Sequence, residues 1–134
     1  LVKYCGTPDT PFARAAGKKW LVSAVARVQQ PGTKADHMLV LEGEQGIRKS
    51  SVPDVLGGRW YTGGMPSLEN KDASMVAASY WIIEIAEMRG LLKSSNDAAN
   101  NFLTQREDRF RPPYGRSLVS FPRQCDILPW TNPY

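Results

Sequence analysis

The sequence has 134 residues, the size of one domain that can bury a core of its own. It contains neither an apolar run of membrane-spanning length nor a basic-then-apolar signal pattern, so we expect a soluble intracellular protein. Two distant cysteines and a single histidine argue against a disulfide framework and against a zinc cluster. Lysine and arginine outnumber aspartate and glutamate by 17 to 13, which permits a polyanionic partner without demanding one.

The first predicted element is a helix over residues 11–29. Thr10 can cap the unpaired amide groups of its first turn, Pro11 suits the first helical position, and Pro31-Gly32 ends it. Apolar residues recur at helical spacing and predict one buried face, which comprises Phe12, Ala16, Trp20 and Ala24, widened by Leu21, Val25 and Val28.

A strand, a glycine-containing loop and a helix start follow over residues 38–51. Gly43, Lys49 and Ser50 fit the phosphate-loop pattern G-x-x-x-x-G-K-[ST]. Loop and helix amides attract an anion, lysine adds a full charge, and the serine hydroxyl suits a magnesium ion. The predicted nucleotide contacts are Gly43, Glu44, Gln45, Gly46, Ile47, Arg48, Lys49, Ser50 and Ser51. The alternative is a strand-turn-helix corner with an incidental Gly-Lys-Ser-like sequence.

Arg48 occupies the position of the second glycine in that pattern. Glycine adopts backbone angles that are costly for other residues and lets phosphate oxygens approach the main chain. We therefore expect either a left-handed Arg48 or a loop shifted away from the phosphate, and weaker nucleotide binding in both cases. Pro53, expected in the second turn of the following helix, predicts a short or kinked helix that Gly57-Gly58 ends.

A second strong strand is predicted over residues 81–86, after a brief strand at 59–62 and a helix at 71–80. We expect it beside the first strand and parallel to it. Glu87 would then end the strand where a carboxylate holds magnesium or orients the attacking water, and Glu84, three residues earlier, could support the metal. The alternative is a pair of ordinary solvent-facing glutamates.

Residues 88–105 suggest a helix interrupted near 94–96, and arginines outnumber acids over residues 106–123. Residues 109–111 and 117–121 alternate as strands around a Pro-Pro-Tyr-Gly turn, which predicts a hairpin. Its basic and aromatic side chains could bind phosphates and stack bases, namely Arg109, Arg111, Tyr114 and Arg116. Alternatively, the arginines pair with Glu107 and Asp108 on an ordinary surface hairpin.

The last predicted strand covers residues 125–130 and contains Pro129, which suits a central strand poorly. We expect this strand to lie next to the first one. Asn132 would then reach a terminal phosphate or the attacking water.

Four stretches together resemble the virulence-associated protein E family of phage and prophage primase-helicase ATPase domains. They are AVARVQQPGTKADHMLVLEGEQGIRKSS at 24–51, WIIEIAEM at 81–88, REDRFRPPYGR at 106–116 and PRQC at 122–125. The resemblance implies an α/β P-loop NTPase core similar to superfamily 3 helicases. Such a core has a mostly parallel central sheet flanked by helices, here with an N-terminal helix and a basic β-hairpin before the last strand.

The resemblance also assigns roles by motif. Gly43, Gly46, Lys49 and Ser50 match the family's phosphate loop, Glu84 and Glu87 its E-x-x-E acidic strand, and Asn132 its polar sensor. It implies ATP and Mg²⁺ as cofactors, catalysis by Lys49, Glu87 and Asn132, and a metal held by Ser50, Glu84 and Glu87. Pro129-Trp130 stands where the family has a small Gly-Thr pair.

The implied function is ATP hydrolysis coupled to binding or unwinding of single-stranded or duplex DNA during replication. Self-association into a ring and a cytoplasmic location in a bacterial or phage-infected cell are implied with it. We expect one domain, a fragment of a longer protein, with an N-terminal helical segment at 1–35 and a nucleotide-binding core at 36–134. The alternative is a non-hydrolysing remnant or truncated fragment that keeps the fold.

Overall fold

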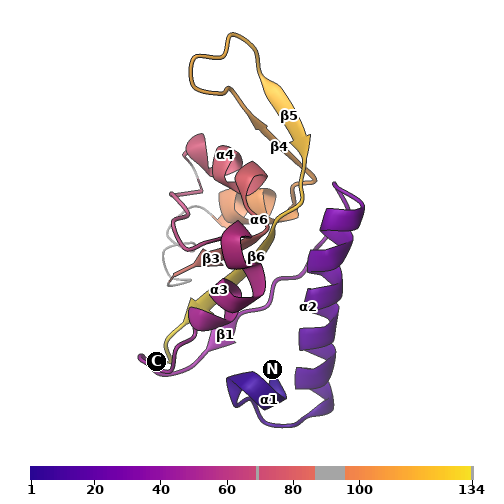
Figure 1. Ribbon diagram of the computed structural model, residues 1–134, viewed down its shortest axis with the longest axis vertical. Helices are drawn as coiled ribbons and strands as arrows, with labels where there is room; N and C mark the ends of the chain where they lie inside the picture. The colour runs from indigo at the N-terminus through magenta and orange to yellow at the C-terminus, as the bar shows by residue number, and fades with distance from the viewer. Residues whose placement is uncertain (69, 87–95, 134) are drawn as a thin grey trace.

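The computed structural model describes residues 1–68, 70–86 and 96–133, and its centre is a four-stranded parallel sheet (Figure 1). The strand order is β1-β6-β3-β2, with β1 at Leu41–Glu42, β6 at Asp126–Thr131, β3 at Ile82–Ile85 and β2 at Tyr61–Thr62. The predicted α/β class with a mostly parallel, helix-flanked sheet is confirmed. The helices are α1 (Val2–Cys5), α2 (Pro11–Gln29), α3 (Ser51–Gly57), α4 (Asp72–Ser79) and α6 (Asn96–Thr104), with a 3-10 turn η1 at Gly58–Trp60.

Two apolar clusters on opposite faces hold the helices to the sheet. Successive strand residues point to opposite faces, so Ile82 and Leu128 pack with Trp20 and Ala24 of α2, and Ile82 also lies against α3 at Gly57. The other face packs against α4 and α6, and its cluster contains Ile83, Ile85, Ile127, Cys125, Ala73, Ala77 and Phe102. The sheet is therefore covered on both faces, as expected for parallel strands.

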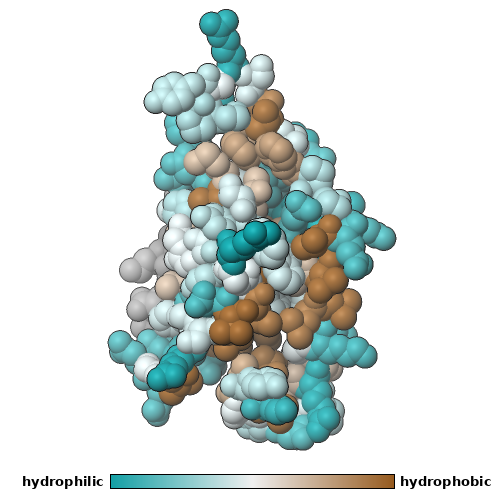
Figure 2. Space-filling view, in the orientation of Figure 1, coloured by the Kyte–Doolittle hydropathy of each residue, from teal (hydrophilic) through white to brown (hydrophobic). Residues whose placement is uncertain are grey.

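Helix α2 has the predicted bounds, and the Thr10 hydroxyl accepts a hydrogen bond from the Ala13 amide at 3.1 Å. Its buried face is narrower than predicted. Phe12 is 81% exposed and Leu21, Val25 and Val28 are close to half exposed, so their assignment to the core was wrong. Figure 2 shows apolar surface along this helix.

Polar contacts fix the rotation of α2 and explain that difference. The Trp20 indole donates to the Ile127 carbonyl at 3.3 Å, and Arg27 donates to the Cys125 carbonyl at 2.7 Å. The side facing the sheet therefore carries Ala13, Gly17, Trp20, Ala24 and Arg27. Apolar periodicity alone could not reveal that an arginine belongs to the buried face.

Strand β1 is shorter than the predicted strand at 38–42 because of Pro129 in the neighbouring β6. Gly43 donates its amide to the Thr131 carbonyl at 3.2 Å, so Thr131 directs its backbone groups towards β1. Pro129, two residues earlier, faces the same side and has no amide hydrogen to donate. Pairing with β1 accordingly begins at Leu41, opposite Trp130. The central strand β6 thus accommodates Pro129 because no residue of β1 pairs with it at that position.

Helix α3 runs from Ser51 to Gly57, so the predicted short helix with its end at Gly57-Gly58 is confirmed, whereas the expected place of Pro53 in the second turn was wrong. Pro53 is the third residue of α3 and lies in the first turn. Amides of the first turn have no intrahelical acceptor, so the missing donor costs the helix nothing there.

The predicted hairpin is present as β4 (Glu107–Phe110) and β5 (Val119–Pro122), which pair antiparallel. It extends from one end of the molecule, whereas β1 and the carboxyl end of β6 lie towards the other (Figure 1). Its base is fixed by Arg123, which is fully buried and forms hydrogen bonds with both oxygens of the buried Asp108. Asp108 is therefore a structural anchor and is not available on the hairpin surface.

Candidate functional site

The ammonium group of Lys49 is enclosed by the loop that carries it. Lys49 Nζ donates to the carbonyls of Gly43 and Glu44, the latter at 2.7 Å, and to Asn132 Oδ1 at 2.9 Å. A lysine ammonium has three donors, so all of them are used within the protein. The ring of Trp130 completes the enclosure, with its centroid 5.1 Å from Nζ. The fold thus brings Lys49 and Asn132, predicted from separate motifs, into direct contact.

A second cluster lies beside the first and centres on the Glu84 carboxylate, which is 4% exposed. Ser50 Oγ donates to Glu84 Oε1 at 2.5 Å, and the same oxygen accepts a hydrogen bond from Trp130 Nε1. The Tyr61 hydroxyl donates to Oε2. Burial and this hydrogen bond raise the pKa of Tyr61 above its ordinary value, so the hydroxyl keeps its proton. We call Ser50, Tyr61, Glu84 and Trp130 the Glu84 cluster.

Two residues of the loop between β1 and α3 have a backbone conformation that L-residues rarely adopt. Gly46 and Arg48 both have left-handed backbone angles, with φ of 89° and 61°. The first of the two expected outcomes for Arg48 is therefore the one observed. Within the described part of the chain, the amides from Gly46 to Ser50 donate no hydrogen bond, whereas those of Ser51 and Val52 bond to Arg48 and Lys49 carbonyls. Five consecutive donors are consequently open to a ligand.

The donor types at Ser50 and Glu84 suit magnesium, which usually takes one or two carboxylates together with phosphate oxygens and water. Both Glu84 oxygens already accept hydrogen bonds from protein donors, so metal ligation would have to replace one of them. Among the described residues, no group of three or more Asp, Glu, His or Cys side chains is placed to hold a metal ion.

One expectation about the sheet was wrong. The acidic strand β3 is parallel to β1 but is not its neighbour, because β6 lies between them. β6 is the longest of the described strands, and it pairs with β3 over four positions and with β1 over two. The expectation that the Asn132 strand adjoins the loop strand is correct, and it explains the contact between Asn132 and Lys49.

Of the two glutamates, Glu84 is the one that contacts Ser50. Glu87 lies outside the described residues. Tyr61 and Trp130 belong to the site and were not predicted as site residues. The sequence did carry a signal for Trp130, since a tryptophan replaces a small residue there, but the partner of Tyr61 depends on the strand order.

The hairpin residues are at a separate location. Arg109 pairs with Glu107 at 2.9 Å on the surface, and this contact and the Ser120 hydroxyl lower the pKa of Glu107. Arg111, Tyr114 and Arg116 are exposed around the turn. Phe110 stacks on Phe121 with ring centroids 5.6 Å apart, so the aromatic of β4 is paired within the hairpin. The hairpin therefore has exposed arginines, Arg111 and Arg116, as one of the two alternatives predicted, and an Arg109–Glu107 ion pair, as the other predicted.

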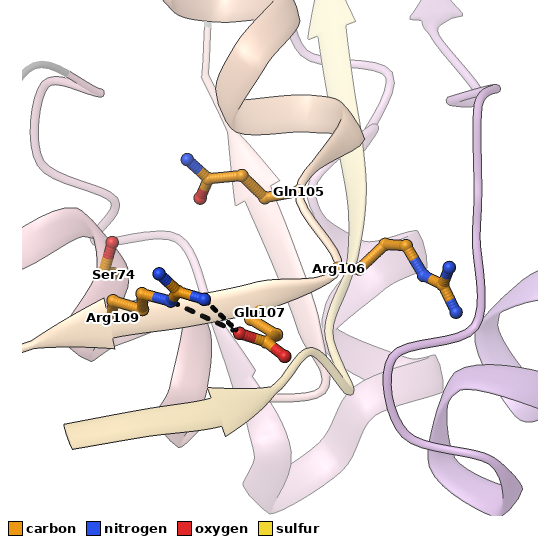
Figure 3. Close-up of a pocket in the computed structure, with 5 residues that line it drawn as sticks. All are labelled: Ser74, Gln105, Arg106, Glu107 and Arg109. Atoms are coloured by element: carbon orange, nitrogen blue, oxygen red, sulfur yellow. Dashed lines mark hydrogen bonds and ion pairs between the residues drawn. The ribbon is translucent and has the colours of Figure 1, made fainter.

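A shallow hollow of about 510 Å³ lies at the base of the hairpin, lined by Ser74, Gln105, Arg106, Glu107 and Arg109 (Figure 3). Its arginines already have partners. Arg109 is directed at Glu107, and Arg106 points away and donates to the Gly32 carbonyl at 2.7 Å. None of its lining residues is a hydrogen-bond partner of Lys49 or Glu84, so the hollow is not part of their site.

The fold and site together define an α/β domain whose polar groups gather at the carboxyl ends of parallel strands, beside a strand-loop-helix turn. The sequence matches the virulence-associated protein E-like domain over residues 1–134, and the chain belongs to that family. A comparison with curated proteins finds no match. No helix within the described residues has both the length and the apolar character needed to cross a bilayer.

Proposed function

We propose that this domain is the nucleotide-binding core of a phage-type replication ATPase, with a P-loop at residues 43–50. The observation that carries the proposal is the convergence of Lys49, Ser50, Glu84 and Asn132. These side chains come from the loop after β1, from β3 and from the end of β6, and each contacts another member. In open parallel sheets, ligands bind outside the carboxyl ends of the strands.

Each residue then has a role in binding ATP. The amides of Gly46 to Ser50 receive phosphate oxygens, and Lys49 exchanges its carbonyl partners for the terminal phosphates. Ser50 and Glu84 would hold Mg²⁺, which neutralises charge on the phosphates. Asn132, released from Lys49, would contact the terminal phosphate or the attacking water. Glu87 remains our proposal for the residue that orients that water.

DNA is the proposed partner of the hairpin. Arg111 and Arg116 are exposed and would bind phosphates, and Tyr114 is fully exposed at the turn, where a base could stack on it. Because the hairpin and strand β1, which precedes the loop, lie towards opposite ends of the molecule (Figure 1), DNA binding and ATP binding should be separable by mutation. Ring assembly, which the family resemblance implies, would be a further part of this proposal.

A second candidate function is nucleic-acid binding without hydrolysis. Two observations favour it: Arg48 has a left-handed backbone that is costly for a residue with a Cβ, and the donors of Lys49 are all used inside the protein. In this case the loop would keep its fold but bind ATP weakly.

Titration calorimetry with Mg-ATP tests the proposal. The wild-type chain should bind, and Lys49→Ala should abolish binding, while Lys18→Ala, at an exposed position on α2, should have no effect. Hydrolysis measured with and without single-stranded DNA then distinguishes the two candidates. Measurable binding of equal strength by wild type and Lys49→Ala would rule out the P-loop assignment.

A further inference from the structure

Trp130 connects the two halves of the site. Its ring lies against the Lys49 ammonium, and its indole nitrogen donates to Glu84. The register accounts for this position. Glu84 pairs with Leu128, and Trp130 is two residues further along β6, so both side chains project from the same face of the sheet. That face also carries α3, whose preceding residue Ser50 donates to the same carboxylate oxygen.

The amides of Gly46 to Ser50 are open, but the side chains of Lys49, Ser50 and Glu84 all have protein partners. The Lys49 donors are taken by Gly43, Glu44 and Asn132. Ser50 gives its proton to Glu84, and the two Glu84 oxygens accept from three donors. The carboxylate is also shielded from water, at 4% exposure. Hydrogen bonds to a charged acceptor in a buried position are among the stronger ones in proteins.

We infer that Trp130 and Tyr61 form a latch that holds the loop closed by occupying Glu84, and that Mg-ATP binds only when the latch opens. This inference rests on the proposed nucleotide-binding function. Trp130 and Tyr61 are positioning residues, because they act through Glu84 and Ser50. If only the open state binds Mg-ATP, the apparent affinity of the protein is reduced in proportion to the fraction of molecules that are open. The latch therefore weakens ATP binding, and it does so specifically when magnesium has to reach Glu84.

The test compares the nucleotide affinity of wild type, Trp130→Phe and Tyr61→Phe. Each substitution removes one donor to Glu84 and keeps an aromatic ring in place. Trp60→Phe is the matched control, because Trp60 is 51% exposed and lies outside the Glu84 cluster. We expect each latch variant to bind Mg-ATP about tenfold more tightly than wild type. With magnesium removed by chelator, the gain should disappear, which a general loosening of the fold would not produce.

A second measurement does not depend on affinity. The indole N–H resonance of Trp130, assigned by its loss in Trp130→Phe, should move when Mg-ATP is added and also in Glu84→Gln, while the Trp60 resonance stays in place. If Trp130→Phe fails to fold, Tyr61→Phe tests the same latch.

The outcomes separate the two hypotheses. Equal Mg-ATP affinity in wild type and both latch variants, or an unmoved Trp130 resonance in the nucleotide complex, overturns the latch and leaves nucleotide binding intact. Binding by the latch variants but not by wild type supports the latch in its strongest form. Absence of binding in every variant overturns the proposed function, and the latch with it.

Discussion

Replacing Arg48 with glycine should stabilise the fold. Arg48 has φ of 61°, a left-handed conformation that costs an L-residue roughly 1 to 2 kcal/mol. Glycine removes this strain but loses about 0.5 to 1 kcal/mol through the greater freedom of the unfolded chain. The free energy of unfolding of Arg48→Gly should therefore rise by about 0.5 to 1 kcal/mol, as measured by urea denaturation.

Two comparisons make this prediction specific. Arg48→Ala removes the guanidinium but keeps the Cβ, so it should show no gain in stability. Tyr114, with φ of 64° at an exposed turn, is the matched control, and Tyr114→Gly should gain a similar amount without changing nucleotide binding. If Arg48→Gly is no more stable than Arg48→Ala, the argument from backbone strain is refuted. Calorimetry on the same variants should show that Arg48→Gly binds Mg-ATP more tightly than wild type, because the phosphate can approach the main chain.

Three further predictions concern charged groups outside the loop. Burial raises the pKa of Asp126 to about 6, above its value in the unfolded chain. Between about pH 4 and pH 6 the folded chain therefore keeps a proton that the unfolded chain has lost. The free energy of unfolding should accordingly fall as the pH rises through this range. Asp126→Asn should flatten this dependence of the free energy of unfolding on pH, as measured by urea denaturation. Asp108→Ala, which leaves the buried Arg123 without its carboxylate, should lower the free energy of unfolding by about 3 to 5 kcal/mol in urea denaturation. The double variant Arg111→Ala/Arg116→Ala should weaken DNA binding and reduce the slope of log affinity against log salt by about 1.5 to 2 in a fluorescence anisotropy titration.

Each of these predictions has a contrary result. A pH-independent stability difference between wild type and Asp126→Asn would contradict the raised pKa. A loss for Asp108→Ala no larger than that for Glu107→Ala, whose ion pair is exposed, would show that burial of the Asp108–Arg123 pair is not decisive. An unchanged salt slope in the arginine variant, with Lys18→Ala as the control, would exclude the hairpin as the phosphate-binding surface.

Local signals predicted the helices best. Thr10-Pro11 marks the start of α2 and Pro31-Gly32 follows its end, so the bounds of this helix could be predicted from the sequence. The hairpin also follows from local alternation around a Pro-Pro-Tyr-Gly turn. These features depend on neighbouring residues only, so no knowledge of the tertiary structure is needed to find them.

Features that depend on distant contacts were less predictable. The truncation of β1 is imposed by Pro129, which lies far along the chain, and the exposure of Phe12 results from the way Trp20 and Arg27 dock α2. Within the candidate site, Lys49, Ser50 and Asn132 could be predicted from motifs. The surroundings of Glu84 could not, since Tyr61 and Trp130 reach it only once the strand order β1-β6-β3-β2 is known.

The central position of β6 also constrains the order in which the chain can fold. β6 follows the other described strands in sequence, yet it pairs with both β3 and β1, so Leu41 must find Trp130, which lies far along the chain. Closing such a long loop is slow, and sheets made of distant parallel pairings form late. During synthesis, β1 and β3 have no strand between them until residues 126–131 leave the ribosome. Until then the edge of β3 that β6 will cover is unpaired, and unpaired strand edges favour association with other chains.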